Sequence, residues 1–254
     1  MYMKTIVVDL DRTLLHTDKT LSDYTVNILK RCKRNGIQIM IATARPLRAT
    51  IPYCDKISFD AMVVSNGARI ICGEYRTEYE IRTEHAIGLL NSLKSYPDLR
   101  ITIETGDCAY SNKKIEDYDT IITEDLIGIV ENEGALKILV HLDHEDILAF
   151  VKEKLTDDFY YTVANGYLLQ IMSREATKWN GIKAMLELSK ATPLETLYFG
   201  DDHDDIEPIK MCGMGVAVSN AIDEVKDVAD AIAGTNDEDG VAKFIEQRYL
   251  NLHK

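Results

Sequence analysis

Residues 5–13 read TIVVDLDRT, a short apolar run that ends in two aspartates spaced two residues apart. The run Thr5–Val8 is continuous rather than alternating, which is typical of a strand buried on both faces of a parallel sheet. Two further runs of this kind occupy Ile37–Ala42 and Ala61–Val64. Between the first two, Ser22–Asn35 places its apolar residues on one helical stripe and begins with a good N-cap. These segments predict a βαβ unit, and such units are right-handed in nearly every known case.

The last third of the chain repeats this alternation of helix and strand. Trp179–Lys190 predicts an amphipathic helix, and Thr196–Phe199 and Gly215–Val218 predict buried strands. We also expect helices at Asp204–Cys212, at Ala221–Ala229 and from Asp239, and a short strand at Ala231–Ala233. Both ends of the chain therefore predict an α/β fold with a Rossmann-like parallel-sheet core.

The middle of the chain predicts antiparallel hairpins and helices instead. Hairpins are expected in Arg69–Glu80, in Ile101–Ser111 and in Tyr160–Met172, each with a turn signal such as Asn165-Gly166 at its centre. Helices are expected at Thr83–Ser95 and Asp146–Leu155, with a strand at Ala135–Leu142. We therefore place an inserted α+β domain at residues 82–174, within a core made of residues 1–81 and 175–254.

Composition limits the partners of this protein. The 254 residues include 29 basic and 42 acidic side chains, for a net charge of −13, so nucleic acid and anionic membranes are not expected partners. No apolar run reaches the roughly 18–20 residues that span a bilayer. The apolar run before Asp9, Thr5–Val8, has only four residues, so we expect no signal peptide. The five scattered cysteines indicate buried thiols in a reducing compartment, and we expect a cytoplasmic protein.

Acidic and hydroxyl side chains follow three of the predicted parallel strands. Asp9 and Asp11 follow the first strand, Thr43 follows the second, and the stretch GDDHDD at Gly200–Asp205 follows Thr196–Phe199. Ligands of open α/β sheets bind outside the carboxyl ends of the strands, so these groups are expected to converge. Converging carboxylates stay ionised together only around a cation, and oxygen ligands of this kind suit Mg²⁺. The pattern predicts a magnesium site rather than a zinc site.

The order of these motifs resembles the haloacid dehalogenase superfamily of phosphatases, in its Cof-type, sugar-phosphatase-like branch. The four motifs are Asp9–Thr13 (DLDRT), Thr43–Arg45 (TAR), Lys178 at the start of a helix, and Gly200–Asp205. The stretches Ser65–Ala68, Val218–Ala221 and Asn236–Val241 also resemble that branch. The resemblance implies a Mg²⁺-dependent phosphatase of small phosphorylated metabolites, with sugar phosphates as the expected substrates and residues 82–174 as a type-II cap.

The resemblance also implies a role for each motif residue. Asp9 would be the nucleophile that forms an aspartyl-phosphate, and Asp11 would be the general acid and base. Thr43 and Lys178 would bind the phosphoryl oxygens. The metal ligands would be Asp9, Asp11 through its carbonyl, Asp201 and Asp205, the last through water or by orienting Lys178. The remaining phosphate and substrate contacts would be Leu10, Arg12, Ala44, Arg45, Asn66, Tyr110 and Asp204.

Four residues depart from the family's pattern: Arg12, Ala44, Trp179 and Asp204, of which Arg12 and Asp204 bear on the site. Arg12 stands where a small residue is usual, and its guanidinium either contacts the phosphate or points outward. Asp204 stands where an asparagine is usual, and a carboxylate cannot donate to a phosphate unless it is protonated. Two other functions stay open. A hexose-phosphate mutase would use the same aspartyl-phosphate, since such relatives share the core and a similar cap. The departures at Arg12 and Asp204 also leave open a regulator that binds a phosphometabolite without catalysis. The sequence is also compatible with either a monomer or a homodimer.

Overall fold

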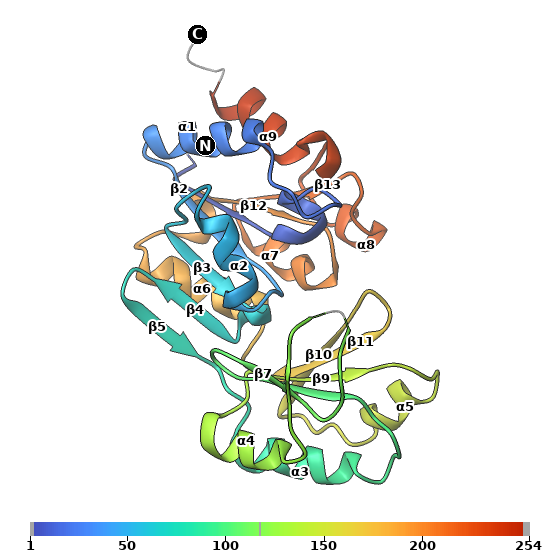
Figure 1. Cartoon of the computed structure of the whole chain (residues 1–254). Coiled ribbons are helices and arrows are strands. Elements are labelled where there is room, and N and C mark those ends of the chain that lie inside the picture. The colour runs from blue at the N-terminus through green and yellow to red at the C-terminus, as the bar shows by residue number, and fades with distance from the viewer. Residues whose placement is uncertain (1–2, 117, 251–254) are drawn as a thin grey trace. The chain divides into compact units, whose positions relative to one another are not determined.

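The computed structural model describes residues 3–116 and 118–250 and divides the chain into two compact units (Figure 1). The core unit takes Met1–Thr77 and Lys178–Lys254, and the inserted unit takes Glu78–Thr177. The predicted insert, residues 82–174, lies within the second unit. Each unit is built on its own sheet, which confirms the predicted fold class of an α/β core with an α+β insert.

The core unit contains a sheet of eight strands in the order β14-β13-β12-β1-β2-β3-β4-β5. Neighbours from β14 to β3 are parallel, and β4 runs antiparallel to β3. The strands are β1 (Thr5–Val8), β2 (Gln38–Ala42), β3 (Ala61–Val64), β4 (Arg69–Cys72), β5 (Tyr75–Glu78), β12 (Thr196–Gly200), β13 (Met214–Val218) and β14 (Ala231–Ala233). Strand β1 lies between β12 and β2 and is buried throughout, as its unbroken apolar run predicts.

Six α-helices flank this sheet among the described residues. They are α1 (Asp23–Arg34), α2 (Leu47–Cys54), α6 (Lys178–Leu188), α7 (Ile206–Met211), α8 (Asp223–Lys226) and α9 (Gly240–Ile245). Helix α1 packs beside α9, whereas α6 packs on β3 and β4 (Figure 1). The Ser22 side chain accepts a hydrogen bond from the Thr25 amide and caps α1 as expected. The sequence analysis did not predict α2, which contains Pro52.

The inserted unit contains a mixed sheet in the order β10-β11-β9-β6-β7-β8. Its strands are β6 (Ile101–Glu104), β7 (Ala109–Ser111), β8 (Ile121–Ile122), β9 (Lys137–His141), β10 (Phe159–Ala164) and β11 (Leu168–Ser173), and its helices are α3 (Thr83–Leu93), α4 (Leu126–Glu133) and α5 (Ile147–Lys152). Alternate residues such as Ile103, Ile138 and Ile171 join the apolar core that these helices complete. Asn165 and Gly166 have φ of 52° and 75°, as the predicted tight hairpin requires. Strand β8 and helix α4 were not predicted.

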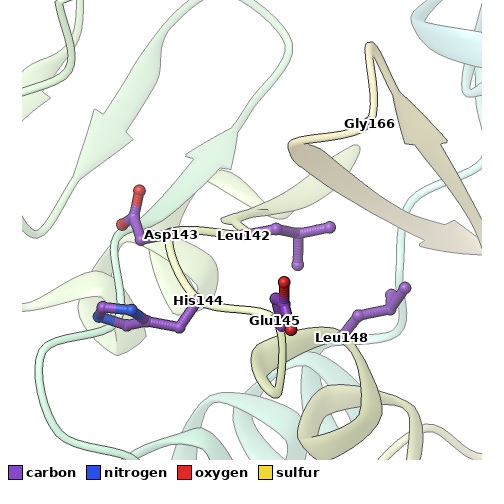
Figure 2. Close-up of a pocket in the computed structure, with 6 residues that line it drawn as sticks. All are labelled: Leu142, Asp143, His144, Glu145, Leu148 and Gly166. Atoms are coloured by element: carbon purple, nitrogen blue, oxygen red, sulfur yellow. The ribbon is translucent and has the colours of Figure 1, made fainter.

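A shallow pocket lies beside α5 in the inserted unit (Figure 2). Its volume is about 470 Å³, and its lining consists of Leu142, Asp143, His144, Glu145, Leu148 and Gly166. The Asp143 carboxylate is paired with the Arg100 guanidinium. None of the residues that the sequence predicts for a site lines this pocket.

The cysteine expectation is only partly right. Cys32 and Cys212 are buried, but Cys54, Cys72 and Cys108 are partly exposed. All five are free thiols. Within the described part of the chain, no helix has both the length and the apolar character needed to cross a membrane.

Gly181 on α6 is expected to be intolerant of a side chain. A Cβ there would lie 2.5 Å from Val63 Cγ1 and 3.2 Å from the Gly67 Cα, so Gly181→Ala must move β3 or the helix. The clash outweighs the better helix propensity of alanine, and we expect the free energy of unfolding to fall by about 1–2 kcal/mol. Urea unfolding followed by the fluorescence of Trp179, the one tryptophan, measures this change.

Gly88 provides the matched control, because it is an exposed glycine of α3 whose Cβ, if it had one, would meet nothing within 4 Å. Gly88→Ala is expected to raise the free energy of unfolding by up to about 1 kcal/mol. A Gly181→Ala variant as stable as the parent protein would contradict the close packing of α6 on β3.

Candidate active site

The carboxyl ends of three adjacent parallel strands bring the predicted acids together. Asp9 follows β1, Thr43 follows β2 and Asp201 follows β12. Because β1 is paired in parallel with both β12 and β2, the three residues emerge at one edge of the sheet. Lys178 is the first residue of α6 and reaches the same place. The structure therefore assembles residues from all four motifs in the core unit.

The Lys178 ammonium lies buried between two carboxylates. Its Nζ donates to Asp9 Oδ1 at 3.0 Å and to Asp205 Oδ1 at 2.6 Å. Burial by itself would lower the pKa of Lys178, but Asp205 and Asp9 outweigh that effect and raise the pKa well above its ordinary value. Lys178 therefore stays charged and can act as a fixed cation.

Asp205 is held by four hydrogen bonds. Oδ1 accepts from Lys178 and from the Tyr198 hydroxyl at 2.5 Å, and Oδ2 accepts from the Asp201 and Asp202 amides at 2.8 and 3.1 Å. A Cβ at Gly200 would lie 2.4 Å from Asp205 Cβ, which explains the glycine at this position. Of the two arrangements that the sequence left open, the structure shows Asp205 orienting Lys178.

Three carboxylates crowd around the buried ammonium of Lys178. Ligand atoms of Asp9, Asp201 and Asp205 all lie within 4.8 Å of one another. Burial, followed by repulsion from Asp205, raises the pKa of Asp201 to about 7. Burial also raises the pKa of Asp9 well above its ordinary value despite Lys178. Three carboxyl groups thus share one ammonium in a buried place, and hard oxygen donors of this kind fit a divalent cation such as Mg²⁺.

The turn that follows β1 supports the carboxylate cluster. The Thr13 hydroxyl donates to Asp201 Oδ1 at 2.8 Å, which ties the first motif to the fourth. Arg12 has a φ of 58°, and its guanidinium donates to the Asn220 carbonyl at 3.2 Å, while its Nε lies 3.8 Å from Asp201 Oδ2. The Arg12 side chain is about half exposed, so it lies at the rim of the cluster.

Asp11 lies in a different electrostatic environment from Asp9. Arg45 donates from Nε to Asp11 Oδ2 at 2.6 Å and from Nη2 to Oδ1 at 2.7 Å, and Lys19 Nζ donates to Oδ1 at 2.8 Å. Burial would raise the pKa of Asp11, but these hydrogen bonds and charges together lower it. The sequence suggested Arg45 as a substrate contact, whereas the structure directs its guanidinium to Asp11.

Thr43, Asn66 and Asp204 lie next to one another at the ends of β2, β3 and β12. The Asn66 amide N–H donates to the Thr43 carbonyl at 3.1 Å, and Asn66 Nδ2 donates to Asp204 Oδ2 at 2.5 Å. Asn66 has a φ of 57°, an uncommon backbone conformation that is frequent at functional sites. Its buried Oδ1 has no hydrogen-bond partner among the described residues. No motif or spacing predicts the pairing of Asn66 with Asp204.

The other predicted contacts are less central. Leu10 and Ala44 directly follow Asp9 and Thr43 in the loops after β1 and β2. Tyr110 belongs to the inserted unit, where its hydroxyl donates to Glu133 at 2.6 Å. The sequence analysis missed Lys19, Tyr53 and Tyr198. Of these, only Tyr198 had a signal, a phenol hydroxyl in the middle of a buried strand.

Comparisons with known proteins agree with this geometry. The family model of haloacid dehalogenase-like hydrolases matches residues 6–245. A 5-amino-6-(5-phospho-D-ribitylamino)uracil phosphatase of Bacillus subtilis is 29% identical over 267 residues, which cover 97% of this chain and 97% of that protein. A crystal structure of a haloacid dehalogenase-like hydrolase from Bacteroides thetaiotaomicron has a TM-score of 0.87 at 26% identity and covers 97% of this chain and 100% of that one.

A sugar phosphatase of subclass IIB shares the fold, with a TM-score of 0.83, 20% identity and coverage of 96% of this chain and 98% of that one. The family match spans nearly the whole chain, including both halves of the core unit and the inserted unit. The chain therefore belongs to the haloacid dehalogenase-like hydrolases, in their Cof-type branch, and is a phosphatase of phosphoric monoesters.

Proposed function

We propose that this phosphatase hydrolyses small phosphorylated metabolites with Mg²⁺ and forms an aspartyl-phosphate on Asp9. The observation that carries the proposal is the buried group of Asp9, Lys178 and Asp201, with Asp205 fixing Lys178 in place. This arrangement puts a nucleophile, a fixed cation and an unbalanced negative charge in one water-poor place, which is what phosphoryl transfer requires.

The metal would be held by the Asp9 and Asp201 side chains and by the Asp11 carbonyl. Bound Mg²⁺ would draw negative charge from the phosphoryl oxygens and so make phosphorus accessible to an anionic nucleophile. Asp205 supports this site indirectly, because both of its oxygens are already used in hydrogen bonds to Lys178, Tyr198 and two amides.

Two displacements at phosphorus complete the reaction. In the first, an Asp9 oxygen bonds to phosphorus, the bond from phosphorus to the ester oxygen breaks, and Asp11 gives its proton to the departing alkoxide. In the second, Asp11 takes a proton from water, the water oxygen bonds to phosphorus, and the bond to Asp9 breaks. The products are an alcohol and inorganic phosphate, and Asp11 again carries the proton with which it started.

Thr43, Lys178 and Asn66 would stabilise the phosphoryl group. The Thr43 side chain and the Lys178 ammonium lie at the same sheet edge as Asp9. Asp204 replaces the usual asparagine of the fourth motif, and the Asn66 amide lies beside it. A carboxamide has two N–H groups, of which one binds Asp204, so the other is available to a phosphate oxygen. Asn66 would thus supply the amide that Asp204 lacks.

Sugar and sugar-alcohol phosphates are the proposed substrates. The Bacillus subtilis relative acts, by its name, on a phosphate ester of a ribityl chain. In the branch that this chain resembles, an inserted domain selects the leaving group, and we assign this role to the inserted unit. A hydrolytic outcome, rather than mutase chemistry, is the simplest use of a single phosphorylated aspartate and water.

Asp9→Asn is expected to abolish phosphatase activity. The amide keeps the shape of the side chain but is a poor nucleophile, so kcat should fall by about 10⁴-fold or more. Release of phosphate from p-nitrophenyl phosphate and a panel of sugar phosphates, with Mg²⁺ present, measures the effect. Asp55→Asn changes an exposed carboxylate of the same unit and should leave kcat unchanged. Equal activity in the Asp9→Asn variant and the parent protein would sink the proposed mechanism.

Mg²⁺ binding is expected to weaken as the pH falls. With a pKa of about 7 in the metal-free protein, Asp201 must lose a proton to bind the cation below pH 7. The Mg²⁺ affinity at pH 5.5 should therefore be roughly 30-fold lower than at pH 8. Isothermal titration calorimetry at pH 5.5 and at pH 8 measures the Mg²⁺ affinity. Asp201→Asn should remove most of the Mg²⁺ binding at both pH values.

The free energy of unfolding of the metal-free protein should also depend on the protonation of Asp201. Because the folded-state pKa of Asp201 is raised above its ordinary value, the folded protein holds this proton more tightly than the unfolded chain does. The Asp201 contribution to stability is therefore lost as the pH rises from about 4 to about 7. Added Mg²⁺ should raise the melting temperature more at pH 8 than at pH 5.5. An increase that is independent of pH would contradict a metal site at Asp201.

A further inference from the structure

We infer that Arg45 is a positioning residue, whose guanidinium fixes the place and orientation of the Asp11 carboxylate. The inference deepens the proposed function, because it rests on Asp11 as the acid and base of the phosphatase reaction. It assigns Arg45 to Asp11 rather than to the substrate. It also assigns proton transfer to one of the two Asp11 oxygens.

Arg45 binds Asp11 through two parallel hydrogen bonds. Nε donates to Oδ2 at 2.6 Å and Nη2 donates to Oδ1 at 2.7 Å. A two-point contact of this kind fixes the plane of the carboxylate as well as its position, which a single ammonium does not do. Lys19 Nζ adds a third bond to Oδ1 at 2.8 Å.

The guanidinium is itself held by the protein on its other sides. Arg45 Nη1 donates to the Ala49 carbonyl of α2 at 3.4 Å, so all three of its nitrogens have a protein acceptor. The Arg45 Cζ lies 5.4 Å from the centroid of the Tyr53 ring, and the Tyr53 hydroxyl donates to the Lys19 carbonyl at 3.1 Å. One aromatic side chain of α2 thus contacts the partners of both Asp11 oxygens.

The two Asp11 oxygens differ in the number of lone pairs that their hydrogen bonds leave unused. Each carboxylate oxygen has two lone pairs. Oδ1 accepts from Arg45 and from Lys19, so both of its lone pairs are used, whereas Oδ2 accepts, among the described residues, only from Arg45 Nε. The remaining lone pair of Oδ2 is therefore the position from which Asp11 gives a proton to the leaving group and takes one from water.

Substrates whose leaving groups differ in basicity can distinguish a residue that positions the general acid Asp11 from a residue that binds the phosphate. A leaving group of low basicity, such as p-nitrophenolate, departs without a proton, whereas a basic one needs the general acid. The ratio kcat/KM reports only the steps up to departure of the alcohol, so it is independent of the later hydrolysis of the aspartyl-phosphate. Aryl phosphates of graded phenol basicity provide substrates of similar shape that differ in this need.

The experiment compares kcat/KM for p-nitrophenyl, phenyl and p-methoxyphenyl phosphates in the full-length protein with Mg²⁺. For Arg45→Gln, we expect at most about a threefold loss with p-nitrophenyl phosphate and a ten- to hundredfold loss with the two basic leaving groups. Asp11→Asn serves as the reference and should show the same pattern more strongly. Arg45→Lys keeps the charge without the two-point contact and should lie between Arg45→Gln and the parent protein.

Two further variants complete the design. Tyr53→Leu removes the ring under the guanidinium and should show a smaller loss confined to the basic leaving groups. Arg31→Gln is the matched control, because Arg31 lies on α1 and pairs with Glu246 instead of Asp11. It should leave all three kcat/KM values unchanged.

A uniform loss for all three substrates in Arg45→Gln would overturn the inference, because a phosphate ligand or a merely structural residue affects every substrate alike. Partial unfolding also lowers all values equally, so it cannot imitate the expected pattern. Hydrolysis of p-nitrophenyl phosphate by the parent protein tests the proposed function separately. Without that hydrolysis both proposals fail, and with it the uniform loss overturns only the role of Arg45.

Discussion

The buried ammonium of Lys178 is the constraint around which the site is built. A charge removed from water is tolerated only where partners surround it, and Lys178 obtains Asp9 from the start of the chain and Asp205 from the last third. Asp205 is in turn fixed by Tyr198 and two amides, and Gly200 leaves the space for it. Losing any one partner would leave a buried charge uncompensated, so the strand ends and the start of α6 are coupled.

Charge balance explains how a strongly acidic protein can bind an anionic substrate. The net charge of −13 repels phosphate at long range, so the field must be reversed within the site. Lys178 supplies one positive charge against the three carboxyl groups of Asp9, Asp201 and Asp205, and burial raises the pKa values of Asp9 and Asp201. A divalent cation at the proposed metal site would add positive charge there, and for that reason we connect capture of the substrate to occupancy of that site.

Asp9 and Asp11 are only two residues apart, but their side chains lie in different electrostatic environments. Asp9 is deeply buried among carboxylates, whereas Asp11 is bound by Arg45 and Lys19. Environments that separate two carboxyl groups in this way are typical of sites that assign them different chemical tasks. In the metal-free protein the pKa of Asp9 is raised and that of Asp11 is lowered, so the proposed roles rest on the positions of the two residues beside Lys178 and beside Arg45 and Lys19.

The sequence alone was enough to predict the α/β core with its α+β insert, since buried runs, caps and hairpin turns are local signals. It also predicted which strand ends meet, because parallel strands share a carboxyl edge. It did not predict α2, α4 or β8, whose apolar patterns are short or interrupted by proline.

Only the tertiary structure decided the partners of individual side chains. Asn66 meets Asp204 across 138 positions of the chain, and Arg45 turns to Asp11 across 34. Motif spacing identifies the residues that reach the site, but hydrogen-bond partners depend on how loops from different strands pack. The sequence therefore determined the chemistry that is available at the sheet edge, and the fold decided which group performs each part of it.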